Sequence, residues 1–548
     1  DRIWVEKILA PGETLPEDWP VDGTTGYEFM NDVAGLLLDE SARDVLDRAY
    51  RRAIPRVRSF PEEVYRCKKL VMETSLSSEL VRLANELDRL SEADYHTRDF
   101  TLEALQDALE EIVASVDRYR TYLPHDPEDA ADVIREAVYR AMSRNPASEP
   151  SVFEFVRSII LGDVRDDLRP MQQAWTRRFQ QYCAPVAAKG VEDTAFYRYH
   201  RLVALNEVGG EPDHFGLSIQ AFHSHARFRA LRYPETLLAT ATHDHKRGED
   251  TRMRLVALSE LADEWEQTQI ELEQIVADYR LDRQPSEADA YLFLQILLAL
   301  WKDSDPEDLP DRIWRYMQKA SRESKLHTSW IRPDEAYEEA LEGMIRGMMA
   351  DERTTDVLEP LTERLADLGF RNSLTQVVLK FTTPGVPDIY QGTELWDLSL
   401  VDPDNRREVD YDLRARIIDD LEKTRPGVDT MRQWIEERDV RIKLHLMVRL
   451  LQLRASFEEF TTAEYRDLEV ESEDQRWLAF ARVASDRNLI VAARRHFGKQ
   501  DESAAHLHLP DTLAGRNWVD VLSGEVTKLN DHVVLNDCPL PWLVLAST

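Results

Sequence analysis

The stretch from Leu237 to Leu255 carries the densest group of side chains that could transfer protons or hold hydroxyl groups. Its first part, Leu237 to Thr242, is an apolar and β-branched run typical of a strand buried on both faces. Charge this dense at a strand's C-terminal end is where an α/β barrel keeps its chemistry. The alternative is that Gly248 opens an exposed helix whose first acidic residues favour the helix dipole. Seven charged or titratable residues fall within eight positions: His243, Asp244, His245, Lys246, Arg247, Glu249 and Asp250.

A second candidate is Glu6, which together with Lys7 interrupts the apolar run from Ile3 to Leu9. Burying a charged pair inside a core strand costs too much without partners, so we expect Glu6 at a strand end, facing a site. An edge strand with Glu6 in water explains the same pattern. The loop that follows, up to Tyr27, is rich in Gly, Pro and Thr, and loops at strand ends commonly carry binding residues.

Aromatic residues lie beside charges in a third stretch, from Pro185 to His200. Four rings occupy positions 196, 197, 199 and 200, and a helix would scatter them around most of its circumference, so we do not expect them all in one core. An aromatic surface beside charges suits sugar rings, whose C–H faces lie on aromatic rings while charged groups bind the hydroxyls. The alternative is that half of the rings lie in a core and half at its rim. The binding candidates here are Lys189, Glu192, Asp193, Phe196, Tyr197 and Tyr199.

A fourth polar loop follows the run from Gln376 to Phe381, which favours a strand. Two prolines and two glycines between Thr382 and Glu394 fix the path of this loop. The side chains that can project from it are those of Asp388, Tyr390, Gln391 and Glu394.

Two helical regions separate these stretches. The first runs from about Glu40 to Leu168, and its spacing predicts helices over Ala104–Tyr122 and over Glu128–Met142. The second runs to about Gly369 and includes a buried helix over Tyr291–Trp301, with Ser286 and Asp289 placed like a capping box. Beyond about Arg454, short alternating strands separated by polar turns predict a small all-β domain.

Composition bounds the class of protein. With 548 residues, 43% of them apolar, the chain is long enough for two to four globular domains. No window approaches the roughly 18 to 20 apolar residues of a membrane span. The three cysteines lie far apart and match no metal spacing, so we expect reduced thiols in a cytoplasm.

The charge balance narrows the possible partners. A net charge of −34 argues against nucleic acid and against anionic membrane surfaces. Only 13 of the 69 basic residues are Lys, a depletion that resembles the surface of a salt-adapted protein. The alternative is an ordinary acidic cytoplasmic protein from a GC-rich genome.

Taken in chain order, these stretches resemble glycoside hydrolase family 13, the α-amylase family, whose catalytic domain is a (β/α)8 TIM barrel. Val5-Glu6 is similar to its fifth strand, Thr242-His243-Asp244 to its seventh, and Pro384 to Glu394 to the eighth-strand loop. Longer stretches are similar to one branch of that family, the malto-oligosyltrehalose synthases. These are Val5 to Tyr27, Tyr119 to Tyr122, Ala188 to Tyr199 and Thr242 to Asp250.

The resemblance covers essentially the whole chain and implies an α/β fold, the C-terminal half of a TIM barrel with large helical insertions and a C-terminal all-β domain. The family's nucleophilic Asp lies in an Arg-x-Asp motif after the fourth strand. No such motif in barrel context precedes Glu6, so we expect strands one to four and the nucleophile outside this sequence. The implied parts are barrel strand 5 and its loop (1–39), a helical insertion (40–184), barrel strands 6 and 7 (185–255), a helical region (256–369), barrel strand 8 with closing helices (370–453) and a β-sandwich domain (454–548).

The resemblance also implies an activity, the intramolecular conversion of the reducing-end α-1,4 link of a maltooligosaccharide into an α,α-1,1 link. A retaining mechanism of this kind uses two carboxyl groups roughly 5 to 5.5 Å apart. Glu6 would be the general acid, and Asp244 and His243 would hold hydroxyls of the reacting sugar. The released glucose must stay bound, and the candidates for holding it are Lys189, Phe196, Tyr197, Tyr199, Lys246 and Arg247.

Further substrate contacts are expected from Glu192, Asp193, Asp388, Tyr390 and Gln391. The substrate would be a maltooligosaccharide or a glycogen-derived α-1,4-glucan, with functional coupling to a trehalohydrolase. No metal and no organic cofactor is implied.

Two competing functions stay open at this point. One is a hydrolase of the same family, which the Lys-Gly-x-Glu-Asp-Thr stretch at Lys189 argues against. The other is a non-catalytic glucan-binding protein, which the missing nucleophile favours. Product analysis separates the first from an isomerase, because a hydrolase releases free trehalose or maltose.

Overall fold

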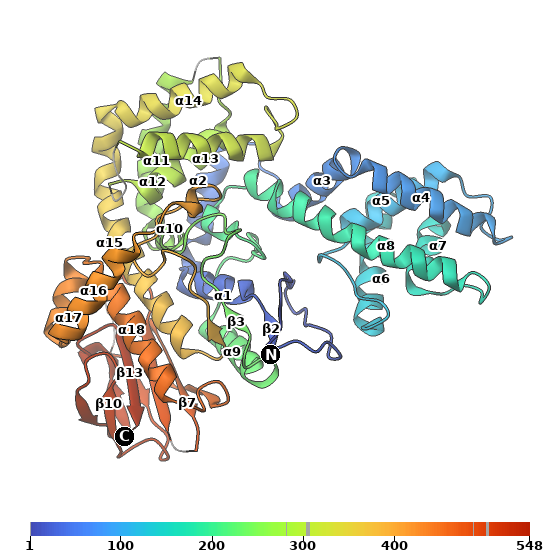
Figure 1. Cartoon of the computed structure of the whole chain (residues 1–548). Helices are drawn as coiled ribbons and strands as arrows, with labels where there is room; N and C mark the ends of the chain where they lie inside the picture. Colours follow the sequence, from blue (N-terminus) through green and yellow to red (C-terminus); the bar gives the residue numbers. More distant parts are fainter. Residues whose placement is uncertain (1, 281, 303–306, 486, 500–503, 548) are drawn as a thin grey trace.

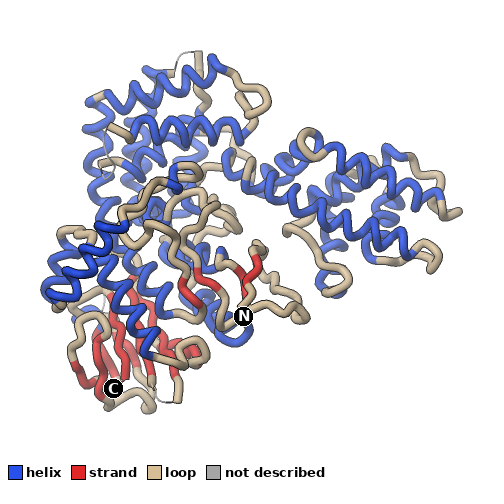
Figure 2. The backbone as a smooth tube through the Cα atoms, viewed as in Figure 1, coloured by secondary structure: helices blue, strands red, loops and turns tan. Residues whose placement is uncertain are grey.

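The computed structural model describes residues 2–280, 282–302, 307–485, 487–499 and 504–547. Helices make up most of it, and strands gather mainly in the C-terminal part (Figures 1 and 2). Within these ranges, no helix is long and apolar enough to cross a membrane.

Four two-residue strands from distant parts of the sequence form two parallel pairs. β1 (Trp4–Val5) pairs in parallel with β2 (Gly23–Thr24), and β3 (Leu237–Leu238) pairs in parallel with β4 (Val386–Pro387). The Thr24 amide donates to the Thr236 hydroxyl at 3.0 Å, so β2 and β3 are neighbours. The order β1, β2, β3, β4 therefore brings segments that are far apart in the sequence side by side, with their C-terminal ends together.

Gly26 allows the chain to leave β2 so close to β3. Its φ is +93°, and a Cβ atom there would lie 2.4 Å from the carbonyl oxygen of Leu237. Any other residue would be strained and would clash with backbone. Helix α1 (Tyr27–Leu37) packs on β3, and α9 (Ile219–Arg232) packs on α1. Helix α2 (Arg43–Ala53) packs instead against helices that follow β3 in the chain.

Two of the strand predictions in this region were wrong in extent or place. The run from Ile3 to Leu9 forms only β1, because Lys7 turns inward to an ion pair with Glu13 at 2.8 Å. Residues 185–255, all of them described, contain one strand, β3, instead of two. The strand between β1 and β3 is β2, which lies in the Gly- and Thr-rich segment predicted to be a loop.

The predicted strand from Gln376 to Phe381 was also wrong, because these residues belong to α15 (Glu352–Thr382), a helix of 31 residues. Its C-terminal half is buried nearly all round. Thr375 explains why polar residues fit there: its hydroxyl donates to the Arg494 carbonyl at 3.1 Å and accepts from the Trp542 indole at 2.8 Å. A helix buried on all sides lacks the polar face that would reveal its period.

Six helices form an arm that projects from the rest of the molecule (Figure 1). They enclose their own apolar core, between Val71 and Val186. The helix predicted to reach Tyr122 ends at Ser115, where the Lys68 ammonium donates to the Val116 carbonyl at 2.5 Å. The six are α3 (Phe60–Glu73), α4 (Ser77–Glu92), α5 (Leu102–Ser115), α6 (Pro127–Arg144), α7 (Pro150–Leu161) and α8 (Arg169–Ala187).

A second helical group follows β3 and packs around α15. The predicted buried helix is α12 (Glu287–Leu300), and Ser286 is confirmed as its N-cap, because the Ser286 hydroxyl accepts from the Asp289 amide at 3.1 Å. The Ser286 amide donates to the Tyr337 hydroxyl at 3.0 Å and not to Asp289, so the reciprocal half of the capping box was wrong. The others are α10 (Glu249–Ala257), α11 (Ala262–Tyr279), α13 (Leu309–Ser324) and α14 (Glu335–Ala350).

The C-terminal part is a sheet domain, reached through α16 (Tyr411–Thr424), α17 (Val428–Glu436) and α18 (Arg441–Ser456). A six-stranded sheet has the order β11-β10-β13-β8-β7-β5, and a three-stranded sheet has the order β12-β9-β6. Residues of both sheets share one apolar core. The strands are β5 (Glu464–Leu468), β6 (Val470–Glu471), β7 (Trp477–Val483), β8 (Asn488–Arg494), β9 (His506–His508), β10 (Asn517–Asp520), β11 (Val526–Lys528), β12 (His532–Val534) and β13 (Trp542–Ser547).

Candidate active site

Two strand ends bring Glu6 and His243 together. Glu6 follows β1 directly, as the sequence predicted, and His243 lies five residues beyond β3. The Glu6 carboxylate and the His243 imidazole are 3.7 Å apart, with 53% and 60% of the two side chains exposed. Tyr27, at the start of α1, donates to Glu6 at 3.4 Å and lies 3.2 Å from the Thr242 hydroxyl. The acid and the imidazole therefore share one accessible surface, and the buried phenol of Tyr27 lies behind them.

Hydrogen bonds of the buried residues Thr242 and His245 hold the turn around His243. The Thr242 hydroxyl accepts from the Asp244 amide, and the Thr242 amide donates to the His245 ring, both at 3.1 Å. Burial lowers the pKa of His245 to about 4, so its imidazole is neutral and accepts this bond. The Asp244 side chain is 50% exposed, beside His243, and burial of its remaining part raises its pKa.

Two lysines and an aspartate form a group of ion pairs next to this surface. Asp193 pairs with Lys189 at 2.6 Å and with Lys246 at 3.3 Å, and Lys246 lies 3.9 Å from Asp244. Burial opposes ionisation of Asp193, but the two ammonium groups outweigh it and hold the pKa of this carboxyl below its usual range. Lys246 is itself buried, so its charge is held in place by these acids.

The aromatic stretch behaves differently from the prediction. Phe196, Tyr197, Tyr199 and His200 are all buried, at most 6% exposed, so the expected aromatic surface is wrong. The reason is local: the segment is a short 3-10 turn, Ala195–Tyr197, followed by irregular chain, so the helical spacing does not apply. Phe60 stacks on Phe196, with ring centroids 5.9 Å apart, which places these rings in the main core.

Arg247, Glu249 and Asp250 are also buried instead of exposed. The Arg247 guanidinium donates to the Asn206 carbonyl at 2.7 Å and to the Tyr316 hydroxyl at 3.0 Å. Every residue of α10, which begins at Glu249, is buried, so the alternative of an exposed helix is wrong. The Lys443 ammonium lies 2.8 Å from Glu249 and 2.7 Å from Asp250, which compensates their charge.

The loop after β4 lies next to the same turn. The Asp388 amide donates to the Leu238 carbonyl at 3.1 Å, and burial raises the pKa of its carboxyl group. The Tyr390 ring lies edge-on to His245, with centroids 5.9 Å apart. Gln391 is exposed. This loop therefore borders the turn at His243–Lys246.

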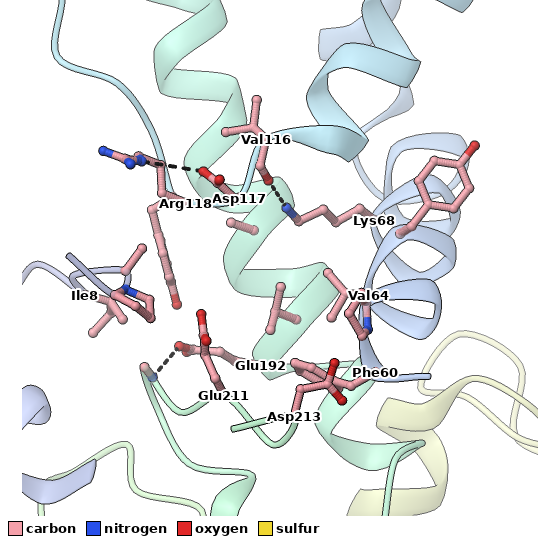
Figure 3. A pocket seen from close by; sticks show the side chains of 18 of the residues that line it. Ile8, Phe60, Val64, Lys68, Val116, Asp117, Arg118, Glu192, Glu211 and Asp213 are labelled. Atoms are coloured by element: carbon pink, nitrogen blue, oxygen red, sulfur yellow. Dashed lines mark hydrogen bonds and ion pairs between the residues drawn. The ribbon is translucent and has the colours of Figure 1, made fainter. Parts of the chain in front are cut away.

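A cavity of about 380 Å³ opens beside the site, between the arm and the β1 segment (Figure 3). Its walls combine Ile8, Phe60 and Val64 with the carboxyl groups of Glu192 and Glu211. Glu192 is 6% exposed and accepts from the Gly209 amide at 3.2 Å. Burial raises the pKa of Glu192 to about 7, although Lys246 acts in the opposite direction.

Two residues of this region were missed by sequence reasoning, Tyr27 and Glu207, and His245 was noted in the charged stretch without a role. Glu207 has no exposed surface and accepts from the amides of Lys246, at 2.5 Å, and Arg247, at 3.2 Å. The signal that identified Glu6, a single carboxylate in an apolar run, is also present in Leu205-Asn206-Glu207-Val208. Tyr27 gave no signal that separates it from other aromatic residues.

Comparisons with known proteins agree with one another. No family model matches the chain. A curated protein of Mycobacterium tuberculosis (strain ATCC 25618 / H37Rv), named a maltooligosyl trehalose synthase, is 32% identical over 99% of this chain. The chain spans 65% of that relative's length.

Solved structures give the same result over the whole chain. The maltooligosyltrehalose synthase of Arthrobacter ramosus is 32% identical, with a TM-score of 0.84, and the match covers 100% of this chain and 66% of that one. A Sulfolobus tokodaii protein, titled a hypothetical maltooligosyl trehalose synthase, is 26% identical with a TM-score of 0.75, covering 100% of this chain and 65% of that one. Over its whole length the chain is therefore similar in sequence and in fold to maltooligosyltrehalose synthases, of which it spans slightly less than two thirds.

Proposed function

We propose that this protein converts the reducing-end α-1,4 link of a maltooligosaccharide into an α,α-1,1 link by intramolecular transglucosylation. The observation that carries the proposal is the meeting of Glu6, His243 and Asp244 at the C-terminal ends of parallel strands. The names of the relatives support the choice of reaction. We also propose that β1 to β4 are half of a (β/α)8 barrel, in which such strand ends carry the chemistry.

In this proposal Glu6 protonates the oxygen of the leaving glucose, and Tyr27, 3.4 Å away, orients its carboxyl group. The partner carboxylate, expected outside the printed sequence, attacks C1 to form a covalent glycosyl intermediate. His243 and Asp244 hold hydroxyls of the reacting sugar. Their bonds accelerate the step to the extent that they strengthen as the ring approaches its oxocarbenium-like transition state. A bound sugar would also cover the exposed halves of Glu6 and His243.

The released glucose must turn over and attack through its own anomeric hydroxyl before water enters. Asp193, whose side chain is 28% exposed, is the best placed group to hold it, and the buried Lys246 fixes Asp193 through a 3.3 Å ion pair beside Asp244. Lys189 is more exposed and would close the edge of this subsite. Tyr197, Tyr199 and Arg247 would act only as the buried support behind it, while Phe196 and Glu192 line the cavity of Figure 3.

Three further expectations belong to this proposal. Asp388, Tyr390 and Gln391 would border the donor sugars, the product would serve a trehalohydrolase, and the protein would work in the cytoplasm.

Glu6→Gln tests the proposal in the full natural protein. Because proton transfer by a positioned acid contributes roughly 10² to 10⁴ in rate, kcat on maltopentaose should fall by about that factor. Calorimetry should show that maltopentaose still binds, because an amide keeps the shape of the carboxyl group. Retention of more than about a tenth of kcat would mean that Glu6 is not the acid.

The chain offers a matched control in Glu471. This residue is also an exposed glutamate in a short strand, and it lies 3.3 Å from His508. Glu471→Gln removes the same charge beside the same kind of partner, but in the C-terminal sheet domain, so kcat should not change. Trehalose-ended product from the unsubstituted protein is the baseline, and its absence would refute the proposed reaction itself.

A further inference from the structure

We infer that Glu207 is a positioning residue that fixes Lys246 and thereby keeps the released glucose from being lost to water. This inference rests on the proposed function, because it concerns the subsite that would hold that glucose. Glu207 itself has no exposed surface, so it acts through other residues.

The Glu207 carboxylate collects donors from the turn that carries the site. One of its oxygens accepts from the Lys246 amide at 2.5 Å and from the Val208 amide at 3.2 Å. The other accepts from the Arg247 amide at 3.2 Å and from the Arg252 guanidinium at 3.3 Å. Four N–H groups on one buried carboxylate make a rigid anchor, since each oxygen has a donor on two sides.

Arg252 binds both the Glu207 carboxylate and the backbone of the same turn. Its guanidinium also donates to the carbonyl of Arg247, at 3.2 Å, and to that of Thr240. Glu207 and Arg252 therefore bind the amide and the carbonyl of the same residue, Arg247. The turn from Thr240 to Arg247 is fixed at both ends, and its backbone cannot shift without leaving buried charges unpaired.

The side of the turn opposite this anchor carries the functional groups. The backbone of Lys246 points inward to Glu207, while its ammonium group reaches Asp193 at 3.3 Å and Asp244 at 3.9 Å. A shift of the Lys246 amide would therefore move its ammonium group and the adjoining Asp244. The long lysine side chain has many rotamers, so only a fixed backbone keeps its charge in one position.

The segment that carries Glu207 also joins the turn to the other wall of the subsite. The Asn206 side chain donates to the carbonyl groups of Phe196, at 2.8 Å, and of Tyr199, at 2.5 Å. The Gly209 amide donates to Glu192 at 3.2 Å. The stretch Asn206–Gly209 thus connects both sides of the Lys246–Asp193 ion pair. Within it, the Glu207 side chain binds the amides of Lys246 and Arg247.

The substitution Glu207→Gln should break hydrogen bonds of this carboxylate without changing the volume of the side chain. An amide has one acceptor oxygen and one NH₂ group, so two of the four donors would face another donor. The Lys246 amide or the Arg247 amide loses its partner in either orientation of the new side chain. The volume is unchanged, so the core around it keeps its packing.

The readout is the partition of turnovers between trehalose-ended product and free glucose, measured in the full natural protein with maltopentaose. A loosened Lys246 lets glucose leave, so the ratio of hydrolysis to isomerisation should rise about 3- to 10-fold in Glu207→Gln, as expected for the loss of an ordinary hydrogen bond. Mere loss of folded protein lowers both products together and leaves this ratio constant.

Asp289→Asn is the matched control. Asp289 is equally buried and accepts from the hydroxyl groups of Ser286 and Tyr337, but it shares no partner with Glu207. Its substitution should leave the product ratio unchanged. If Glu207→Gln does not fold, Glu207→Asp keeps the charge but withdraws both oxygens from the turn, and the same rise in the ratio is expected.

A double-substitution cycle separates positioning from a general effect. Combined with Lys246→Met, Glu207→Gln should change the ratio no further, because both act through the same ammonium group. An unchanged ratio in Glu207→Gln and Glu207→Asp, or effects that multiply in the double variant, would overturn the inference. Failure of the unsubstituted protein to make trehalose-ended product would instead refute the proposed function.

Discussion

The two halves of the charged stretch after β3 use similar residues for opposite purposes. His243 and Asp244 are at least half exposed and are held by few, long contacts. Six residues later, Glu249 and Asp250 are buried and share the ammonium group of Lys443 at 2.8 and 2.7 Å. The second group joins α10 to α18 and leaves no surface for a ligand. Charge density in a sequence thus identifies the region of a site, and only burial separates its binding residues from its supports.

The largest expected effect comes from breaking the buried half. Lys443→Met leaves Glu249 and Asp250 without their shared cation, and removal of one partner from a buried ion pair typically costs about 3 to 5 kcal/mol of stability. Chemical denaturation followed by circular dichroism measures it. The exposed pair of Lys302 and Glu359 is the control, where Lys302→Met should cost at most about 1 kcal/mol. Equal losses of stability in the two variants would show that burial does not distinguish the two ion pairs.

Buried Glu192 should make the free energy of unfolding depend on pH. Its folded pKa, about 7, is above the ordinary value of 4.5, because burial disfavours its charge. The unfolded carboxyl group loses its proton first as pH rises, so the folded state binds more protons between about 4.5 and 7. Stability should therefore fall across that window, by about 3 kcal/mol. Glu192→Gln should remove this slope from the pH dependence of the unfolding free energy. A slope that persists in Glu192→Gln would assign it to other groups.

Asp244→Asn tests the exposed half. We expect a fall in kcat/KM on maltopentaose of about 10- to 100-fold, the usual range for losing a hydrogen bond to a charged group. Thermal denaturation should show almost no change, because substitutions at exposed positions stay within roughly 0.5 kcal/mol. A large loss of stability would place Asp244 with the supports.

Salt should give the smallest effect. If the Lys-poor acidic surface is an adaptation, the melting temperature should rise by a few degrees up to about 1 M KCl, where the Debye length is near 3 Å. The cost of Lys443→Met should stay the same in low and high salt, because buried charges are screened much less. A melting temperature that is flat or falls would contradict the adaptation.

Elements with a local signal were predictable. The N-cap at Ser286 was confirmed, because an N-cap is decided by residues within one turn. Glu6 at a strand end followed from the cost of burying a lone charge. Gln376–Phe381 was misassigned because the β-branched residues of a helix buried on all sides look like those of a buried strand.

The burial of the rings at Phe196–Tyr199 could not be predicted from spacing. It depends on Phe60 in the arm and on Asn206, which binds two carbonyl groups of that segment. Both partners are distant in sequence or outside the local period. Site residues on exposed loops were therefore easier to identify than the buried residues that fix them.

The arm has a consequence for the order in which the protein is made. The residues of its core lie between Val71 and Val186, whereas the main core joins residues from Phe29 to Ala546. The arm can thus complete its packing on the ribosome while His243 is still untranslated. The main core must wait for the last strand, so the nascent chain carries Glu6 beside a finished arm but without its partners until late in synthesis.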